Sequence, residues 1–182
     1  MISILESPSA LAEKIKDKSN DPLKVCFVCT GNTCRSPMAA ALLNDMGRVP
    51  EVCSMCPPNL LNRRRIVATS CGIAASEGIP ISRNAVLALE EAGIKALPGN
   101  DYPNHRAKRV DISDLALNDI IIGISSSHAM ALIGAFPQFA SKITCMDEDI
   151  PDPFGMDLDD YISCMDKIRT SIERMFFENG EN

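Results

Sequence analysis

The sequence predicts an α/β protein in which one parallel sheet lies between two layers of helices. The main observation is an alternation along the chain, because short apolar runs typical of buried strands are followed by longer segments with helical periodicity. A second observation is size, since 182 residues suffice for one hydrophobic core and are few for two. A third is uniformity, since no internal repeat, low-complexity block or Gly/Ser/Pro-rich linker divides the chain.

Four apolar runs are expected to form the strands, at residues 23–28, 66–70, 119–125 and 142–146. Helices are expected at residues 36–46, 81–92 and 127–136, and a short amphipathic helix at 10–18. The final helix has the clearest periodicity, carried by apolar residues three and four positions apart: Ile162, Met165, Ile168, Ile172, Met175 and Phe176.

Local signals indicate where two of these helices begin and end. Ser36 is expected to cap the first helix of the sheet layers, with Pro37 at its first position and Gly47 at its end. Gly93 is expected to end the helix at 81–92. The whole pattern predicts a three-layer α/β/α sandwich with a four-stranded parallel sheet, Rossmann-like or flavodoxin-like. Ligands of such folds bind at the carboxyl ends of the strands.

The charge of the chain excludes some classes of function. There are 18 Lys and Arg against 24 Asp and Glu, which gives a net charge of −6. Proteins that bind nucleic acid or anionic membranes usually have the opposite balance, so we expect neither partner. No signal peptide or membrane span is recognisable. We therefore expect a cytoplasmic protein in which the eight cysteines are reduced thiols.

The segment from Cys29 to Pro37 carries the chemistry. It links the end of a strand to the start of a helix, so several backbone N–H groups can point into one concavity beside a positive helix end. Gly31 and Asn32 are residue types that tolerate the positive φ such a tight loop demands. Arg35 can hold two oxygens of a phosphate, and the positive field favours the thiolate of Cys29. The segment thus predicts a nucleophilic thiolate that faces a bound phosphate.

These residues resemble the signature of the low-molecular-weight protein tyrosine phosphatase family, Cys-x-Gly-Asn-x-Cys-Arg-Ser-Pro, at every fixed position. A second family motif, an Asp-Pro-aromatic loop before the last helix, is matched by Asp152, Pro153 and Phe154. The resemblance covers about residues 23–178. It implies a single phosphatase domain at 23–182, with residues 1–22 as an N-terminal extension and an insertion near 48–62.

The resemblance also implies a role for each matching residue. Cys29 would be the nucleophile that becomes a phosphocysteine, Arg35 would bind the phosphate and its transition state, and Asp152 would act as general acid and then general base. Asn32 would hold the unusual backbone of the loop, and the Ser36 hydroxyl would stabilise the thiolate. The implied phosphate- and substrate-binding set is Thr30, Gly31, Asn32, Thr33, Cys34, Arg35, Ser36 and Phe154. No cofactor or metal is implied.

Within the family, the chain resembles the protein arginine phosphatases more closely. Their loop has Thr at the position of Thr33, where tyrosine-directed members usually have an aliphatic residue, and their acid loop reads Asp-Pro-Phe-Gly, as residues 152–155 do here. A threonine hydroxyl can meet the polar guanidinium of phosphoarginine. The expected substrates are phosphorylated proteins, with phosphoarginine preferred. A phosphotyrosine-directed phosphatase, a thiol-coupled arsenate reductase and a non-catalytic phosphate-binding module remain alternatives. The sequence leaves the oligomeric state open.

Seven acids and no base fall between residues 147 and 160: Asp147, Glu148, Asp149, Asp152, Asp157, Asp159 and Asp160. Two interpretations are open. The acids could form a carboxylate rim that attracts a guanidinium, or they could form a solvated loop and the charged start of a helix.

The other polar residues carry weaker expectations. Cys34 could form a reversible disulfide with Cys29 or be a small packed side chain. Cys53 and Cys56 could form a redox pair or be incidental thiols, and zinc is improbable because ligands are too few. The cluster around His105 and the side chain of Tyr102 are expected on the surface, although Tyr102 could instead line the mouth of the site.

Overall fold

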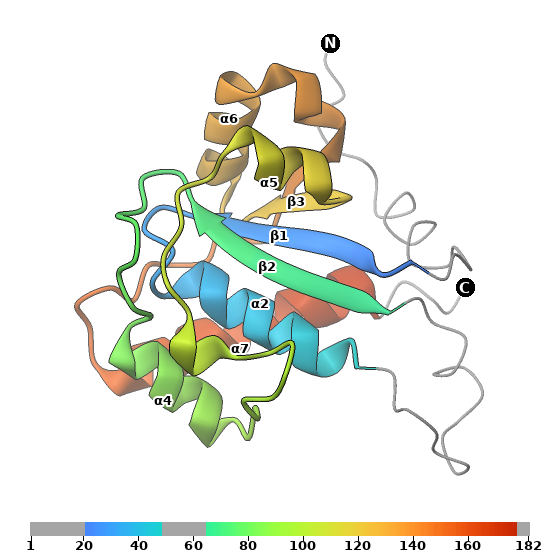
Figure 1. The fold of residues 1–182 in the computed structure, drawn as a ribbon. Coiled ribbons are helices and arrows are strands. Elements are labelled where there is room, and N and C mark those ends of the chain that lie inside the picture. The colour runs from blue at the N-terminus through green and yellow to red at the C-terminus, as the bar shows by residue number, and fades with distance from the viewer. Residues whose placement is uncertain (1–20, 49–64, 178–182) are drawn as a thin grey trace, which may run out of the picture.

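The computed structural model describes residues 21–48 and 65–177 and contains a four-stranded sheet with helices on both faces (Figure 1). All strand pairs are parallel, and the strand order is β2-β1-β3-β4. The strands are β1 (Leu23–Cys29), β2 (Ile66–Gly72), β3 (Ile120–Gly123) and β4 (Ile143–Cys145). The helices are α2 (Arg35–Met46), α4 (Arg83–Glu91), α5 (Ile112–Leu117), α6 (Ser126–Ala135) and α7 (Leu158–Phe176), with short 3₁₀ turns at Tyr102–Asn104 and Pro137–Lys142.

The helices form two layers, with α2, α4 and α7 on one face of the sheet and α5 and α6 on the other (Figure 1). Alternate side chains of a strand point to opposite faces, so β1 contributes to both cores. Val25 and Phe27 pack in the larger core under α2 and α7, whereas Cys26 and Val28 pack in the smaller core under α5 and α6. The predicted three-layer sandwich with a four-stranded parallel sheet is confirmed.

The central strand β1 positions the loop of interest. β1 pairs with β2 over its whole length and with β3 from Val25 to Val28, and it ends at Cys29. The chain then passes through one loop into α2 at the carboxyl edge of the sheet (Figure 1). Ser36 is not the N-cap of α2, as expected from the sequence, because Cys34 occupies that position and Ser36 lies inside the first turn. Gly47 does end the helix.

The strand β2 lies at one edge of the sheet and is covered by a side chain of α2. The Asn44 amide donates to the Ala68 carbonyl at 2.9 Å, and the Ala68 N–H donates to the Asn44 carbonyl at 2.8 Å. Further along, the Gly72 N–H donates to the Lys108 carbonyl, and the Val110 N–H donates to the Gly72 carbonyl. Side-chain and loop contacts thus satisfy backbone groups that would otherwise face solvent.

The short helix α5 was not expected from the sequence. It has six residues, which is too short for a periodic pattern, and a capping box holds it: the Asp111 side chain accepts from the Asp114 N–H, and the Asp114 side chain accepts from the Asp111 N–H. Tyr102 was expected on the surface or at the mouth of the site, and both expectations are wrong. Its side chain is buried, and its hydroxyl donates to the Ile94 carbonyl at 2.8 Å.

Some expectations fall on residues that the structure does not describe. These are the helix at 10–18, most of the insertion near 48–62, and the pair Cys53 and Cys56. Within residues 21–48 and 65–177, no helix is long and apolar enough to cross a membrane.

Removal of one buried side chain from α2 should destabilise the fold strongly. Leu42 has no exposed surface and packs in the larger core, so Leu42→Ala should lower the free energy of unfolding by about 2–5 kcal/mol. Leu117→Ala is the control, because Leu117 is 65% exposed and its truncation should change the free energy by less than about 0.5 kcal/mol. Urea denaturation measures both. Equal losses would contradict the placement of α2 against the core.

Candidate active site

The loop from Cys29 to Arg35 wraps around a small pocket at the carboxyl end of β1. The pocket has a volume of about 220 Å³ and is lined by the whole loop and by two residues of the segment before α7: Cys29, Thr30, Gly31, Asn32, Thr33, Cys34, Arg35, Asp152 and Phe154. Every residue of the predicted catalytic and binding set therefore lies at this pocket except Ser36, which is fully buried against it. Two segments more than 100 residues apart in sequence thus meet as expected.

Asn32 gives the loop its shape. It adopts φ +56°, the left-handed region that Asn tolerates better than most residues. Its fully buried amide donates to the Ser36 and Ser70 hydroxyls, both at 2.9 Å, and accepts from the Lys108 N–H at 2.9 Å. Gly31 does not have a positive φ, contrary to expectation, because Asn32 makes the left-handed turn of the loop by itself.

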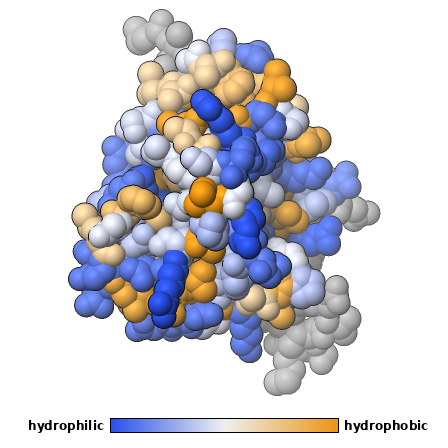
Figure 2. Space-filling view, turned by 60° about the vertical axis from the view of Figure 1, so that its left-hand side comes forward, coloured by the Kyte–Doolittle hydropathy of each residue, from blue (hydrophilic) through white to orange (hydrophobic). Residues whose placement is uncertain are grey.

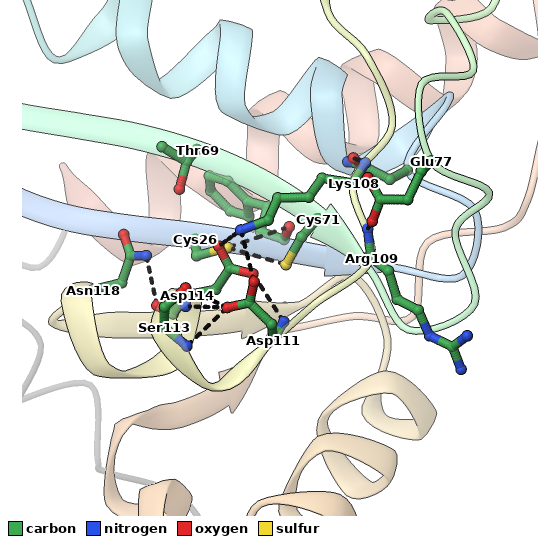
Figure 3. Close-up of polar contacts among 12 residues, drawn as sticks. Cys26, Thr69, Cys71, Glu77, Lys108, Arg109, Asp111, Ser113, Asp114 and Asn118 are labelled. Carbon is green, nitrogen blue, oxygen red and sulfur yellow. Dashed lines mark hydrogen bonds and ion pairs between the residues drawn. The ribbon is translucent and has the colours of Figure 1, made fainter.

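The segment that contacts Asn32 is itself fixed by ion pairs (Figure 3). Lys108 Nζ lies 2.6 Å from a carboxylate oxygen of Asp114 and 3.3 Å from one of Asp111, and these contacts raise the pKa of Lys108. The Arg109 N–H donates to the Glu77 carboxylate at 2.8 Å. This network holds residues 108–110 beside β2, so that the Lys108 N–H meets Asn32.

His105 was expected on the solvated surface, and this expectation is wrong. Its Nε2 lies 3.0 Å from the Asn32 carbonyl oxygen, and burial lowers its pKa. A neutral ring with a hydrogen on Nε2 can donate to that carbonyl. His105 therefore stabilises the left-handed conformation of Asn32, in addition to the Lys108 N–H.

Two hydrogen-bond donors point at the sulfur of Cys29. The Ser36 Oγ lies 3.0 Å from the sulfur, and the Asn32 N–H donates to it at 3.3 Å. Ser36 also accepts from Asn32, which leaves its own hydrogen for the sulfur or for the Cys71 carbonyl oxygen 3.3 Å away. Both donors favour a negative charge on the sulfur.

The guanidinium of Arg35 has two paired nitrogens and one unpaired nitrogen. The residue is 7% exposed, its Nη1 donates to the Ile150 carbonyl at 3.1 Å, and its Nη2 pairs with Asp152 Oδ2 at 2.5 Å. Its Nε is buried and has no hydrogen-bond partner among the described residues. An unpaired buried donor on the wall of a pocket is costly unless a ligand satisfies it. The geometry thus suits an anion with two oxygens for the guanidinium fork.

The acid loop contributes two residues with different environments. The Asp152 side chain is half exposed, and its second oxygen accepts from the Phe154 N–H at 3.2 Å. Phe154 is 73% exposed, so its ring is available at the mouth of the pocket. A carboxyl group and an aromatic ring therefore lie together at the pocket.

Of the two interpretations of the seven acids, a carboxylate rim does not fit the pocket, because Asp152 is the only one of the seven that lines it. Asp149 accepts from the Ser126 N–H at the start of α6, and Asp157 accepts from the Asp160 N–H at the start of α7. Asp147 and Glu148 both pair with Arg174. The alternative interpretation, of structural and helix-start charges, fits these contacts.

The described cysteines other than Cys29 are free thiols in packed positions. Cys34 Sγ lies 3.2 Å from the Tyr161 hydroxyl, and burial raises the pKa of Cys34. Burial, together with that contact, raises the pKa of Tyr161 to about 12. Cys26 and Cys71 lie on neighbouring strands with their sulfurs 3.4 Å apart, and that contact and burial raise the pKa of Cys71 (Figure 3). The disulfide between Cys29 and Cys34 stays a prediction.

One residue at the site was missed by sequence reasoning altogether. His128, in the first turn of α6, places Nε2 3.0 Å from the Thr30 hydroxyl. Its position could have been found from topology, because the residues that follow β3 must lie beside those that follow β1 when the two strands are parallel neighbours. Among residues 21–48 and 65–177, no group of three His, Cys, Asp or Glu side chains is placed to hold a metal ion.

The fold and the pocket define the class of this protein, which is that of the cysteine-dependent protein phosphatases. The chain belongs to the low molecular weight phosphotyrosine protein phosphatase family, whose model matches residues 24–181. It is 32% identical over 161 residues to a protein-arginine-phosphatase of Geobacillus stearothermophilus, covering 85% of this chain and 94% of that protein.

Two further relatives show the breadth of the family. The crystal structure of a low molecular weight protein tyrosine phosphatase from T. tengcongensis superimposes with a TM-score of 0.70 at 33% identity, covering 84% of this chain and 97% of that one. An arsenate reductase of Bacillus cereus is 28% identical over 161 residues, covering 86% of this chain and 96% of that protein.

A methyl group on Gly72 should distort the loop. A Cβ there would lie 2.6 Å from the Thr30 carbonyl oxygen and 3.1 Å from the Asn32 Cβ. Overpacking of this kind costs about 1–3 kcal/mol, and because the strain falls on the loop around Cys29, Gly72→Ala should lower kcat/KM for p-nitrophenyl phosphate by about 5- to 150-fold. Gly134→Ala, where a Cβ has no neighbour within 4 Å, is the matched control and should keep the wild-type value. Wild-type kinetics in Gly72→Ala would show that the loop does not depend on this contact.

Proposed function

We propose that this protein hydrolyses phosphorylated protein side chains through a phosphocysteine on Cys29, with phosphoarginine preferred over phosphotyrosine. The observation that carries the proposal is one pocket lined by three residues: Cys29, whose sulfur contacts the Ser36 hydroxyl and the Asn32 N–H, Arg35, whose buried Nε has no partner among the described residues, and Asp152. A nucleophile, an anion clamp and an acid are the three parts that phosphoryl transfer to a cysteine requires.

In the first step, the phosphoryl group of the substrate binds to the guanidinium of Arg35 and to the backbone amides from Thr30 to Arg35. The phosphoryl dianion replaces the Asp152 carboxylate as the partner of the Arg35 guanidinium. The Cys29 thiolate attacks phosphorus, and the bond from phosphorus to the leaving nitrogen or oxygen breaks. Protonated Asp152 gives its proton to that leaving atom, so that a tyrosine side chain departs as the phenol and an arginine side chain as the guanidinium.

In the second step, water enters the position that the leaving group has vacated. The carboxylate of Asp152 takes a proton from this water, whose oxygen attacks phosphorus. The phosphorus–sulfur bond breaks, which releases inorganic phosphate and restores the Cys29 thiolate. Ser36 and the Asn32 N–H, which contact the sulfur, stabilise the charge that returns to it.

Three features support phosphoarginine as the preferred substrate. Thr33 lines the pocket, and its hydroxyl, 3.6 Å from Cys34 Sγ, offers an oxygen acceptor to a guanidinium that has only donors. The second feature is the identity of 32% to a protein-arginine-phosphatase. The exposed ring of Phe154 can lie against the flat face of a guanidinium.

The same ring also favours the alternative of a phosphotyrosine substrate, because it can pack against a phenol. The similarity to a structurally characterised tyrosine phosphatase supports that alternative. The similarity to an arsenate reductase supports a third one, in which arsenate occupies the phosphate position. Phosphopeptides and arsenate assayed in parallel separate the three.

Asp152→Asn should separate binding from turnover. Loss of the general acid and base should lower kcat by about 10²–10⁴-fold. Inorganic phosphate should bind at least as tightly as in the wild type, because the variant no longer places a carboxylate on Arg35. The measurements are kcat for p-nitrophenyl phosphate and the inhibition constant of phosphate. A large loss of phosphate affinity would mean that Asp152 builds the pocket instead of serving the proton transfer.

Thr33→Ile should shift the preference toward phosphotyrosine, because it replaces an acceptor on the pocket wall by an apolar side chain. The ratio of kcat/KM for phosphoarginine to that for phosphotyrosine peptides should fall about tenfold. Cys29→Ser serves as the blank and should abolish turnover of both. A wild-type enzyme with equal or better phosphotyrosine turnover would refute the preference, and turnover in Cys29→Ser would refute the phosphocysteine.

A further inference from the structure

His128 is a buried histidine that the mechanism above does not use. It lies in the first turn of α6 directly after β3, and it is 5% exposed. Its Nε2 lies 3.0 Å from the Thr30 Oγ1, and its Nδ1 lies 2.6 Å from the Ser125 Oγ. Both ring nitrogens therefore have one hydroxyl partner each, and the ring cannot rotate without loss of a hydrogen bond.

The backbone around His128 is packed too closely for the ring to shift. Gly123, the last residue of β3, approaches α6 so closely that a Cβ there would lie 2.7 Å from the Ala129 nitrogen and 3.2 Å from the His128 Cβ. The Ser125 hydroxyl also contacts the Ser127 hydroxyl at 2.8 Å. The ring is thus held by a close strand–helix contact and by a chain of hydroxyl groups.

The partner of His128 is a substrate-facing residue. Thr30 is exposed, lines the pocket and directly follows Cys29. Burial, followed by the charge of Arg35, lowers the pKa of His128, so its ring is neutral near pH 7 and one nitrogen accepts while the other donates. With the hydrogen on Nδ1, the ring donates to Ser125 and accepts the Thr30 hydroxyl hydrogen at Nε2.

We propose that His128 is a positioning residue that draws the hydroxyl hydrogen of Thr30 away from the pocket and so presents the oxygen to the substrate as an acceptor. This role rests on the proposed function, because a guanidinium leaving group carries only N–H donors and needs acceptors on the wall. Thr30 would then be a second oxygen acceptor beside Thr33. A nitrophenol leaving group has no N–H donor and gains nothing from this contact.

The test is a double-mutant cycle on His128 and Thr30, read as the ratio of kcat/KM for a phosphoarginine peptide to that for p-nitrophenyl phosphate. His128→Leu should lower this ratio about tenfold, and so should Thr30→Val, which keeps the shape of the side chain. In the Thr30→Val background, His128→Leu should change the ratio less than about twofold, because its target is gone. His128→Gln, whose amide can occupy the place of Nε2, should restore part of the ratio.

The other histidine of the chain supplies the matched control. His105 also contacts the loop, but it does so at the Asn32 carbonyl and away from the leaving group. His105→Leu should lower kcat/KM for both substrates by similar factors and leave the ratio unchanged. The thermal midpoints of all variants show whether a lower kcat/KM comes from a destabilised fold or from the lost hydrogen bond. If His128→Leu does not fold, Thr30→Val and His128→Gln still decide the matter.

The outcomes separate this inference from the proposed function. A normal ratio in His128→Leu or in Thr30→Val would overturn the role of His128, and so would equal losses from His128→Leu in both backgrounds. In each case the wild-type preference for phosphoarginine would stand. A wild-type enzyme that cleaves p-nitrophenyl phosphate but not phosphoarginine would overturn both the preference and this role.

Discussion

The left-handed conformation of Asn32 is the constraint on which the site depends. A buried polar residue with positive φ is stable only when its hydrogen bonds are made. The Asn32 side chain bonds to Ser36 on α2, to Ser70 on β2 and to the Lys108 N–H. The main-chain carbonyl of Asn32 contacts His105, which, like Lys108, belongs to the segment before α5. The shape of the seven-residue loop from Cys29 to Arg35 is therefore set by elements that lie far from it in sequence. Ion pairs around Lys108 support this arrangement from outside.

The positive charge of Arg35 at the pocket is compensated by a neighbouring carboxylate and a carbonyl. The guanidinium of Arg35 is buried, and its charge is met by the carboxylate of Asp152 and the Ile150 carbonyl. A carboxylate that is half exposed can leave at little cost, whereas the guanidinium is fixed by burial. The contact with Asp152 thus compensates the charge of Arg35 and can be exchanged for a contact with another anion.

The parts of the site that lie in one short segment were predictable from the sequence, and the parts that depend on tertiary structure were not. Cys29, Asn32, Arg35 and Ser36 are neighbours in sequence, so their residue types and spacing indicate a phosphate loop by themselves. Asp152 was found through a family resemblance, since nothing local connects it to the loop.

His105 and His128 were missed because no pattern in their own segments marks them, and their contacts arise from the order of the strands. The interpretation of the seven acids as a rim of the pocket does not fit the structure, for the opposite reason. Acids that cluster in sequence are separated by the folding of the chain, and Asp149 and Asp157 bond to the starts of two different helices. The strands and helices were found to within a few residues, apart from α5, whose six residues show no period.

The contact between Asn44 and Ala68 has a consequence for association between molecules. An open edge strand can pair with the edge of another molecule and begin aggregation. Here the amide of Asn44 imitates a neighbouring strand, because it donates to the Ala68 carbonyl and accepts from the Ala68 N–H. In the view turned toward the carboxyl edge of the sheet, exposed hydrophobic residues lie in separate small groups between hydrophilic ones (Figure 2). One side chain of α2, the helix that follows the loop from Cys29 to Arg35, thus also keeps the edge of the sheet from acting as a template for other chains.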